Sequence, residues 1–377
     1  MAKSDGTDED MTDDIALTAD EVEELIEAED DVTPVAYMGS DFDVEGLVRR
    51  LKRNDIVIPS FGYKGEPIDF AGFQRAFVWT RNQMDRFIES LLLGFPIPGI
   101  MLVQQVDNKY LVLDGQQRLR TLAAFYDGVY DGKEFALQNV SLQFKGLTYK
   151  TLEPDMRRQL DNTFIQATIV RTDGTAGSRE AVYQVFERLN SGGTQLTPHE
   201  IRVALYAGPL IDYLNDLNHQ PVWREIYGAV SPRLRDQELV LRIIALYVQQ
   251  GAYYRPLKKY LNDFAEEYRE LNNLDGDNVK RLFIAAAAYL AIAGGRDAIR
   301  YQSRQVNAAL TEALFVALMR RIDESPKSAI EPDIISNWIE DLSGHKNFVP
   351  AITRSTASEE NVRIRHELAF SAIMRRS

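Results

Sequence analysis

The sequence predicts an α+β domain followed by an all-helical domain. Short segments with a β-type pattern alternate with helical segments between about residues 35 and 206, whereas only helical periodicity follows, from 207 to 377. The first 34 residues show neither pattern, and their acidic, polar composition is typical of a disordered tail. With 377 residues, the chain is long enough for two domains whose cores need no disulfide.

Within the predicted α+β domain, strands and helices alternate irregularly. We expect strands at 56–61, 100–105, 109–113 and 165–171, and helices at 81–93, from 115 to about 124, at 154–162 and from 178 onward. The pair Asp107-Asn108 between two of these strands predicts a hairpin turn. In the second domain, helical spacing predicts helices at 236–250, 257–271, 278–293, 306–322, 332–342 and 359–375.

The composition excludes several kinds of site. There is no cysteine, which rules out disulfides, thiol nucleophiles and thiolate-bound metals. The four histidines are scattered, so a histidine-rich metal site is not expected. No apolar run approaches the roughly 20 residues of a membrane span, and the acidic start of the chain is unlike a secretory signal. We therefore expect a soluble, cytoplasmic protein without a membrane partner.

The net charge of −13 is concentrated in one segment. Residues 1–31 contain 14 acidic side chains and a single basic one, which leaves 42 acidic and 42 basic residues in the other 346. The remainder of the chain is therefore formally neutral, so the acidic isoelectric point does not exclude an anionic ligand.

The most informative motif is Y-L-V-L-D-G-Q-Q-R-L-R-T-L, at residues 110–122. A buried strand would end at Asp114, a glycine would make the turn, and a helix would begin with polar side chains. The free N–H groups and positive dipole end of a helix attract phosphate, and Gln116, Gln117 and Arg118 would add donors there. Asp114 could hold a metal, a sugar hydroxyl or a water. The alternative is an ordinary helix start, with an N-cap aspartate and a solvated first turn.

A second motif, F-Q-R-A-F-V-W, spans residues 73–79. Arg75 lies between aromatic residues, an arrangement that suits an anion contact or a stacking surface for bases. The alternative is that the aromatic residues belong to the core and that Arg75 only extends past them to the surface.

A third motif, at residues 181–204, predicts two helices joined by a Ser-Gly-Gly loop. The second helix would begin at a capping box, T-P-H-E, with His199 on its surface. Arg188, Asn190 and the amides of the loop could surround a phosphate, as glycine-rich loops can. The alternative is a plain connection between helices.

In this order, the three motifs resemble the N-terminal domain family of the GmrSD restriction endonucleases. The helix that ends in L-L-L-G-F-P-I-P, at residues 91–98, fits the same pattern, and the resemblance runs from about residue 40 to 206. It implies a ParB/sulfiredoxin-like fold for this domain. Members of the family act in prokaryotic defence against phage with modified DNA, and several bind or hydrolyse nucleoside triphosphates. The resemblance therefore implies a Mg²⁺-dependent nucleoside triphosphatase that acts in anti-phage defence or in sensing of DNA modification.

The resemblance also implies a set of site residues. Gln117 and Arg118 match the Q-R pair that such domains need for nucleotide hydrolysis, and Asp114 completes the catalytic set; Gln117 or Asp114 would orient the attacking water. Mg²⁺ would bridge the phosphates, although the motifs do not identify a protein ligand for it. The implied phosphate-binding residues are Arg75, Gly115, Gln116, Arg188 and Asn190.

The second half departs from full-length members of the family, which often end in an HNH nuclease domain. His345 and Asn347 have no second histidine near them in the sequence, so we expect no nuclease domain in residues 207–377. A separate nuclease or defence protein would then be a partner. Two alternatives remain open: a ParB-like module that binds or nicks DNA, and a non-catalytic interaction scaffold.

Overall fold

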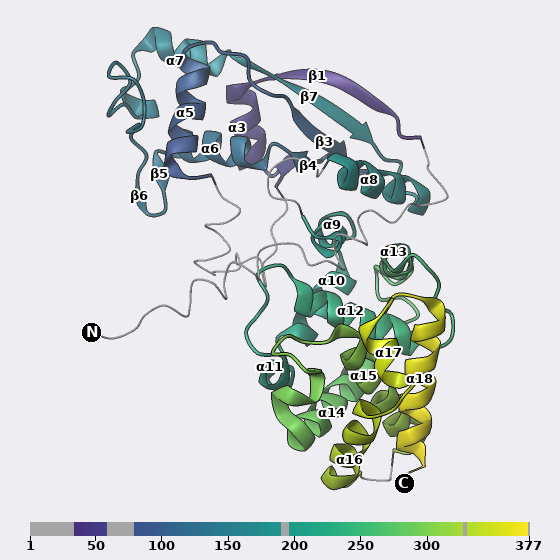
Figure 1. Ribbon diagram of the computed structural model, residues 1–377. Coiled ribbons are helices and arrows are strands. Elements are labelled where there is room, and N and C mark those ends of the chain that lie inside the picture. Colours follow the sequence, from purple (N-terminus) through teal and green to yellow (C-terminus); the bar gives the residue numbers. More distant parts are fainter. Residues whose placement is uncertain (1–33, 59–78, 190–195, 327–329, 376–377) are drawn as a thin grey trace, which may run out of the picture. The chain divides into compact units, whose positions relative to one another are not determined.

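A computed structural model describes residues 34–58, 79–189, 196–326 and 330–375 of the chain (Figure 1). The described residues form two compact units: the first contains residues 34–58 and 79–189, and the second contains the described residues from 196 onward. The domain boundaries after residues 34 and 206 stay predictions, and almost all of the predicted acidic tail lies outside the described residues.

The first unit is built on a five-stranded mixed sheet with the strand order β1-β7-β3-β4-β2. β3 (Ile100–Gln104) and β4 (Tyr110–Asp114) form the predicted antiparallel hairpin, and β3 runs parallel to β7 (Phe164–Arg171). β1 (Tyr37–Asp43) pairs antiparallel with β7 at one edge, while β2 (Ile56–Val57) pairs parallel with β4 at the other. β4, which forms the first part of the motif at residues 110–122, therefore lies inside the sheet. It pairs with β3 on one side and with β2 on the other.

Two strands differ from the expectation. β1 exposes most of its side chains, so it lacks the alternating apolar pattern by which a strand is recognised in sequence. β2 covers only Ile56–Val57 of the strand predicted at 56–61, and residues 59–61 of that prediction lie outside the described residues.

The core of the first unit lies between the sheet and a group of helices (Figure 1). Alternate residues of β7, Ile165, Ala167 and Ile169, contribute to this core, because side chains of a strand point to opposite faces in turn. The helices contribute apolar residues three and four positions apart. They are α3 (Val44–Lys52), α5 (Arg81–Leu92), α6 (Gln116–Asp127) and α7 (Pro154–Asp161).

Shorter elements complete the first unit. The connection from α6 to α7 contains the two-stranded pair β5 (Val129–Tyr130) and β6 (Lys133–Glu134), followed by the short helix η2 (Tyr149–Thr151). After β7, the chain forms α8 (Ala176–Leu189).

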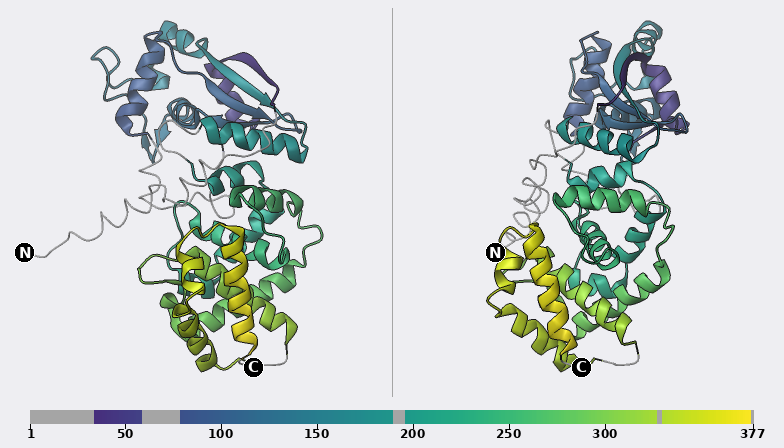
Figure 2. Two further views of the ribbon diagram at one scale, coloured as in Figure 1. Left: turned by 45° about the vertical axis from the view of Figure 1, so that its right-hand side comes forward. Right: turned by 90° about the vertical axis from the view of Figure 1, so that its right-hand side faces the viewer.

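The second unit is helical, and the green and yellow ribbon of Figure 2 shows helices and loops only. α15 (Ala308–Glu324) is buried along most of its length and packs against α12, α14 and α18, which makes it the central helix. The other helices are α9 (Pro198–Leu205), α10 (Pro209–Asn218), α11 (Pro221–Tyr227), α12 (Arg235–Val248), α13 (Leu257–Glu267), α14 (Gly276–Gly294), η3 (Gly295–Ile299), α16 (Pro332–Ser343), α17 (Phe348–Thr353) and α18 (Glu359–Met374). The predicted α+β fold followed by helices is confirmed.

One stretch of the second unit is more apolar than its sequence pattern predicts. Residues Gly276–Ile299, which include α14, are long and apolar enough to cross a membrane. However, Val279, Phe283 and Ala286 on one face of α14 are buried, and the helix packs against α11, α15 and α16. A core helix of a folded domain has the same properties, so this stretch is weak evidence for a membrane span.

Candidate functional site

The candidate site lies where β4 ends and α6 begins (Figure 1). β4 is buried at Leu111, Val112 and Leu113, whereas the side chain of Asp114 is 66% exposed. The strand therefore delivers a carboxylate to the surface at the point where the chain turns into the helix.

Gly115 makes this turn possible. Its φ of +93° is in the left-handed region, and a Cβ atom at this position would lie 2.5 Å from Cγ2 of Ile100. A side chain would thus be strained by the backbone and would also overlap the neighbouring strand β3. Glycine allows α6 to begin directly after β4, without a connecting loop.

The first turn of α6 has no side-chain cap, because its N-cap residue is Gly115. The amides of Gln116, Gln117 and Arg118 belong to this turn, whose N–H groups have no acceptor within the helix. Such an end carries partial positive charge and attracts anions. The prediction that Asp114 serves as the N-cap, which was the alternative to a binding site, is wrong, since the cap is the glycine.

Arg118 lies over this turn and is largely buried. Its Nη2 is 2.7 Å from Oδ2 of Asp114, one helical turn away, and its side chain is 13% exposed. Its Nε is buried and has no hydrogen-bond partner among the described residues. A buried guanidinium N–H without an acceptor is costly, so an acceptor supplied by a ligand would stabilise this arrangement.

The two glutamines of the motif differ in their surroundings. Gln116 is partly exposed. The side-chain Oε1 of Gln117 instead accepts a hydrogen bond from the main-chain N–H of Trp79, at 3.3 Å. No signal in the sequence links Gln117 to Trp79.

The structure does not bring all the predicted residues together. Asp114, Gly115, Gln116, Gln117 and Arg118 share one turn because they are consecutive in sequence.

Two of the other predicted residues, Arg75 and Asn190, lie outside the described residues. Arg188 is exposed in the last turn of α8, and no hydrogen bond or ion pair joins it to the described residues of the turn.

The described part of the chain has no metal site built from protein side chains alone. No three histidine, aspartate or glutamate side chains in it are grouped so that they could hold a metal ion. A surface hollow of the first unit lies away from the α6 turn, and it is lined by Arg86, Glu89, Ser90, Leu93, Phe95, Asn139, Val140 and Ser141.

The predicted surface position of His199 is wrong. His199 is buried, and its Nε2 lies 3.1 Å from Oε1 of Gln237 while its Nδ1 lies 3.2 Å from Nη1 of Arg202. Burial and, to a lesser extent, Arg202 hold the pKa of His199 well below its ordinary 6.5. The capping box correctly gives the start of α9, but a cap fixes where a helix begins and not which of its sides is covered.

A known protein family matches the segment that contains both the α6 turn and His199. Residues 45–207 match the family described as the GmrSD restriction endonuclease, N-terminal domain. This segment is similar to a GmrSD N-terminal domain. The matched segment includes α3 and most of the sheet of the first unit, the α6 turn, and α9 of the second unit. No curated protein and no solved structure matches the chain.

Proposed function

We propose that this chain binds and hydrolyses nucleoside triphosphates in a restriction-type defence of prokaryotes against phage. The observation that supports it best is the α6 turn. There the buried Arg118 Nε has no acceptor among the described residues, and it lies beside a helix end whose N-cap is a glycine. The family whose domain this chain contains is described as a restriction endonuclease, which supports the role in defence.

The turn offers the groups that a phosphoryl transfer needs. The amides of the first turn and the Arg118 guanidinium would bind phosphate oxygens and stabilise the charge that develops on the transferred group. Arg118 contacts Asp114, so a bound phosphate would compete with this carboxylate for the guanidinium.

The described residues fit a magnesium ion that is held together with the nucleotide. Mg²⁺ is commonly bound by one or two carboxylates, several waters and the phosphates of the substrate, and it neutralises charge on those phosphates. Asp114 would hold it, since Oδ2 accepts from Arg118 while the side chain as a whole remains mostly exposed.

We further propose a cytoplasmic protein that works with a separate nuclease or defence protein. His345 and Asn347 have no second histidine near them in the sequence, as an HNH nuclease site would need, which favours cleavage of DNA by a partner. A DNA-binding or DNA-nicking module is the second candidate, but the balanced charge of residues 32–377 offers little attraction for duplex DNA. A non-catalytic scaffold is the third candidate.

The test is turnover of the four common nucleoside triphosphates with Mg²⁺ by the full chain and by Arg118→Ala. We expect the variant to lose at least about 100-fold in kcat/KM, because one preorganised charge contact to a transferring phosphoryl group contributes that much or more. Its circular dichroism should show the wild-type fold, whatever the change in melting temperature from the loss of a largely buried side chain.

Arg158→Ala is the matched control. Arg158 is an exposed arginine of the same unit, and its ion pair with Asp155 is on the surface, so its loss should leave turnover unchanged. Wild-type turnover in folded Arg118→Ala, or equal losses in both variants, would contradict the site. Salt-dependent binding of duplex DNA without any turnover would instead favour the second candidate.

A further inference from the structure

Gln117 makes a long-range contact in addition to its place in the α6 turn. Its Oε1 accepts the main-chain N–H of Trp79 at 3.3 Å, across 38 positions of sequence. Its main-chain oxygen accepts the hydroxyl of Thr121 at 2.7 Å. Both the backbone and the side chain of Gln117 are therefore held, and the side-chain oxygen is directed at a main-chain donor.

The partner residue is itself fixed by packing. The ring of Trp79 lies edge-on to Phe87 of α5, with the ring centroids 5.3 Å apart and the planes at 65°. Thr80, the next residue, caps α5, because its side chain accepts from the amide of Gln83 and the Gln83 side chain accepts from the amide of Thr80. The hydrogen bond from Trp79 thus joins the first turn of α6 to the residue just before the N-cap of α5.

We propose that Gln117 is a positioning residue, which holds the first turn of α6 against the start of α5 and so keeps Arg118 and the turn amides in place for phosphate. This role rests on the proposed function of the α6 turn. It differs from the role that the family resemblance implies, in which Gln117 or Asp114 orients the attacking water. A residue that orients water lowers turnover when it is lost, whereas a residue that holds the site together weakens binding.

Two substitutions separate the hydrogen bond from the size of the side chain. Gln117→Met keeps the length of the side chain but removes the acceptor for Trp79. Gln117→Glu keeps an acceptor, although it adds a negative charge near the phosphates. Gln138→Met is the control, since the side chain of Gln138 is exposed and lies outside the α6 turn.

The first measurement needs no nucleotide and reports on Trp79 itself. The chain has three tryptophans, and the other two, Trp223 and Trp338, are buried in the helical unit. Full-length protein labelled with 5-fluorotryptophan should give three ¹⁹F resonances, and Trp79→Phe identifies that of Trp79. We expect Gln117→Met to shift or broaden this resonance alone, while Gln117→Glu and Gln138→Met leave it at its wild-type position.

The second measurement separates KM from kcat for the nucleoside triphosphate that the wild type turns over best, with Mg²⁺. We expect Gln117→Met to raise KM about tenfold, since one lost hydrogen bond accounts for about a tenfold change in affinity. We expect kcat to fall as well, because a displaced Arg118 also stabilises the transferred phosphoryl group less well.

An unchanged Trp79 resonance in Gln117→Met, or a large fall in kcat at constant KM, would overturn the positioning role. If the wild type neither binds nor hydrolyses any nucleotide, the proposed function fails, and the ¹⁹F spectra still report separately whether Gln117 holds Trp79.

Discussion

Gly115 is the residue on which the geometry of the candidate site depends. It occupies the left-handed region with φ +93°, and the Cγ2 atom of Ile100 leaves no space for a Cβ atom. These two conditions are independent of each other: the first concerns the local backbone, and the second concerns packing against the neighbouring strand. Together they explain why the strand can turn into a helix within a single residue.

Gly115→Ala should therefore destabilise the protein by about 2–5 kcal/mol, from the strain of a left-handed backbone and from overpacking. Gly132→Ala is the control, because Gly132 also has a positive φ but no atom within 4 Å of a Cβ at its position. It should lose about 1–2 kcal/mol, the backbone cost alone. Urea unfolding measures both values, and equal losses would contradict the role of Ile100.

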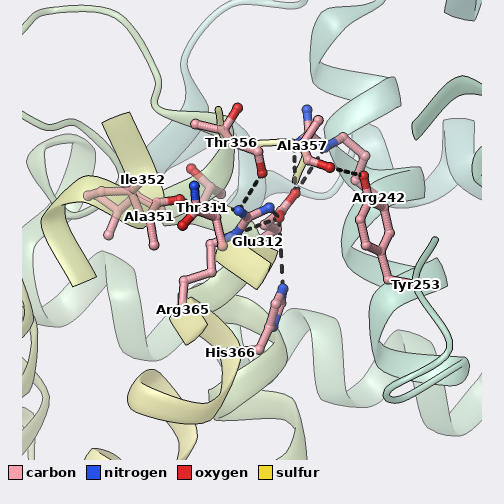
Figure 3. Close-up of polar contacts among 12 residues, drawn as sticks. Arg242, Tyr253, Thr311, Glu312, Ala351, Ile352, Thr356, Ala357, Arg365 and His366 are labelled. Carbon is pink, nitrogen blue, oxygen red and sulfur yellow. Dashed lines mark hydrogen bonds and ion pairs between the residues drawn. The ribbon is translucent and has the colours of Figure 1, made fainter. Parts of the chain in front are cut away.

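At the scale of elements, a buried charge cluster joins three helices of the second unit (Figure 3). Glu312 of α15 accepts from Arg242 of α12 at 2.9 Å and from Nε of Arg365 of α18 at 2.9 Å, and His366 lies 3.8 Å from it. Burial would raise the pKa of Glu312, but the two guanidiniums outweigh it and hold this pKa well below its ordinary 4.5. The buried carboxylate of Glu312 thus joins α15 to α12 and α18, because each of these two helices supplies a guanidinium that compensates its charge.

Glu312→Gln should cost about 3–5 kcal/mol at pH 7, because it leaves two buried guanidiniums without their carboxylate. The pKa of Glu312 is lowered in the folded state, so its contribution is fully present above the unfolded pKa near 4.5 and is lost as the pH falls below that value. The difference between variant and wild type should therefore shrink below pH 4.5. Glu324→Gln, at a half-exposed pair of the same helix, should change the stability by less than about 0.5 kcal/mol. A variant as stable as the wild type at pH 7 would show that the cluster does not stabilise the unit.

At the scale of the whole molecule, charge is divided unevenly along the sequence. The segment 1–31 carries 14 acidic residues against one basic residue, while the remaining chain is formally neutral. A tethered segment has an effective concentration of about millimolar near its own domain, so even weak contacts with a positive site would compete with an anionic ligand. The acidic segment is therefore expected to lower the affinity for nucleotide or DNA. The alternative role is that of a segment that only increases solubility.

Deletion of residues 2–34 should raise the affinity for nucleotide at low salt. The gain should shrink toward 0.5 M salt, because screening weakens contacts between exposed charges. The affinity for the preferred nucleoside triphosphate with Mg²⁺ is measured at low and at high salt, for the full-length protein and for the protein without residues 2–34. Equal affinities at low salt would leave only the solubility role for the segment.

Much of this molecule follows from the sequence by itself, because the signals concerned are local. Apolar spacing predicts the β3–β4 hairpin, α5 and most of the long helices, and the strand-Gly-helix pattern predicts a turn at Gly115. The order of the motifs identifies the GmrSD N-terminal domain, which the family match at residues 45–207 confirms. The site residues between Asp114 and Arg118 could be named in advance because they are consecutive, so one turn holds them all.

Only the tertiary structure decides the contacts between distant segments, since no local pattern encodes which side of an element is covered. Strand β1 escapes prediction because its position comes from pairing with β7 and not from an apolar face of its own. The burial of His199 depends on α12, and the hydrogen bond of Gln117 depends on Trp79, 38 positions away. The buried Nε of Arg118 likewise results from packing around the turn, which removes it from water without supplying an acceptor.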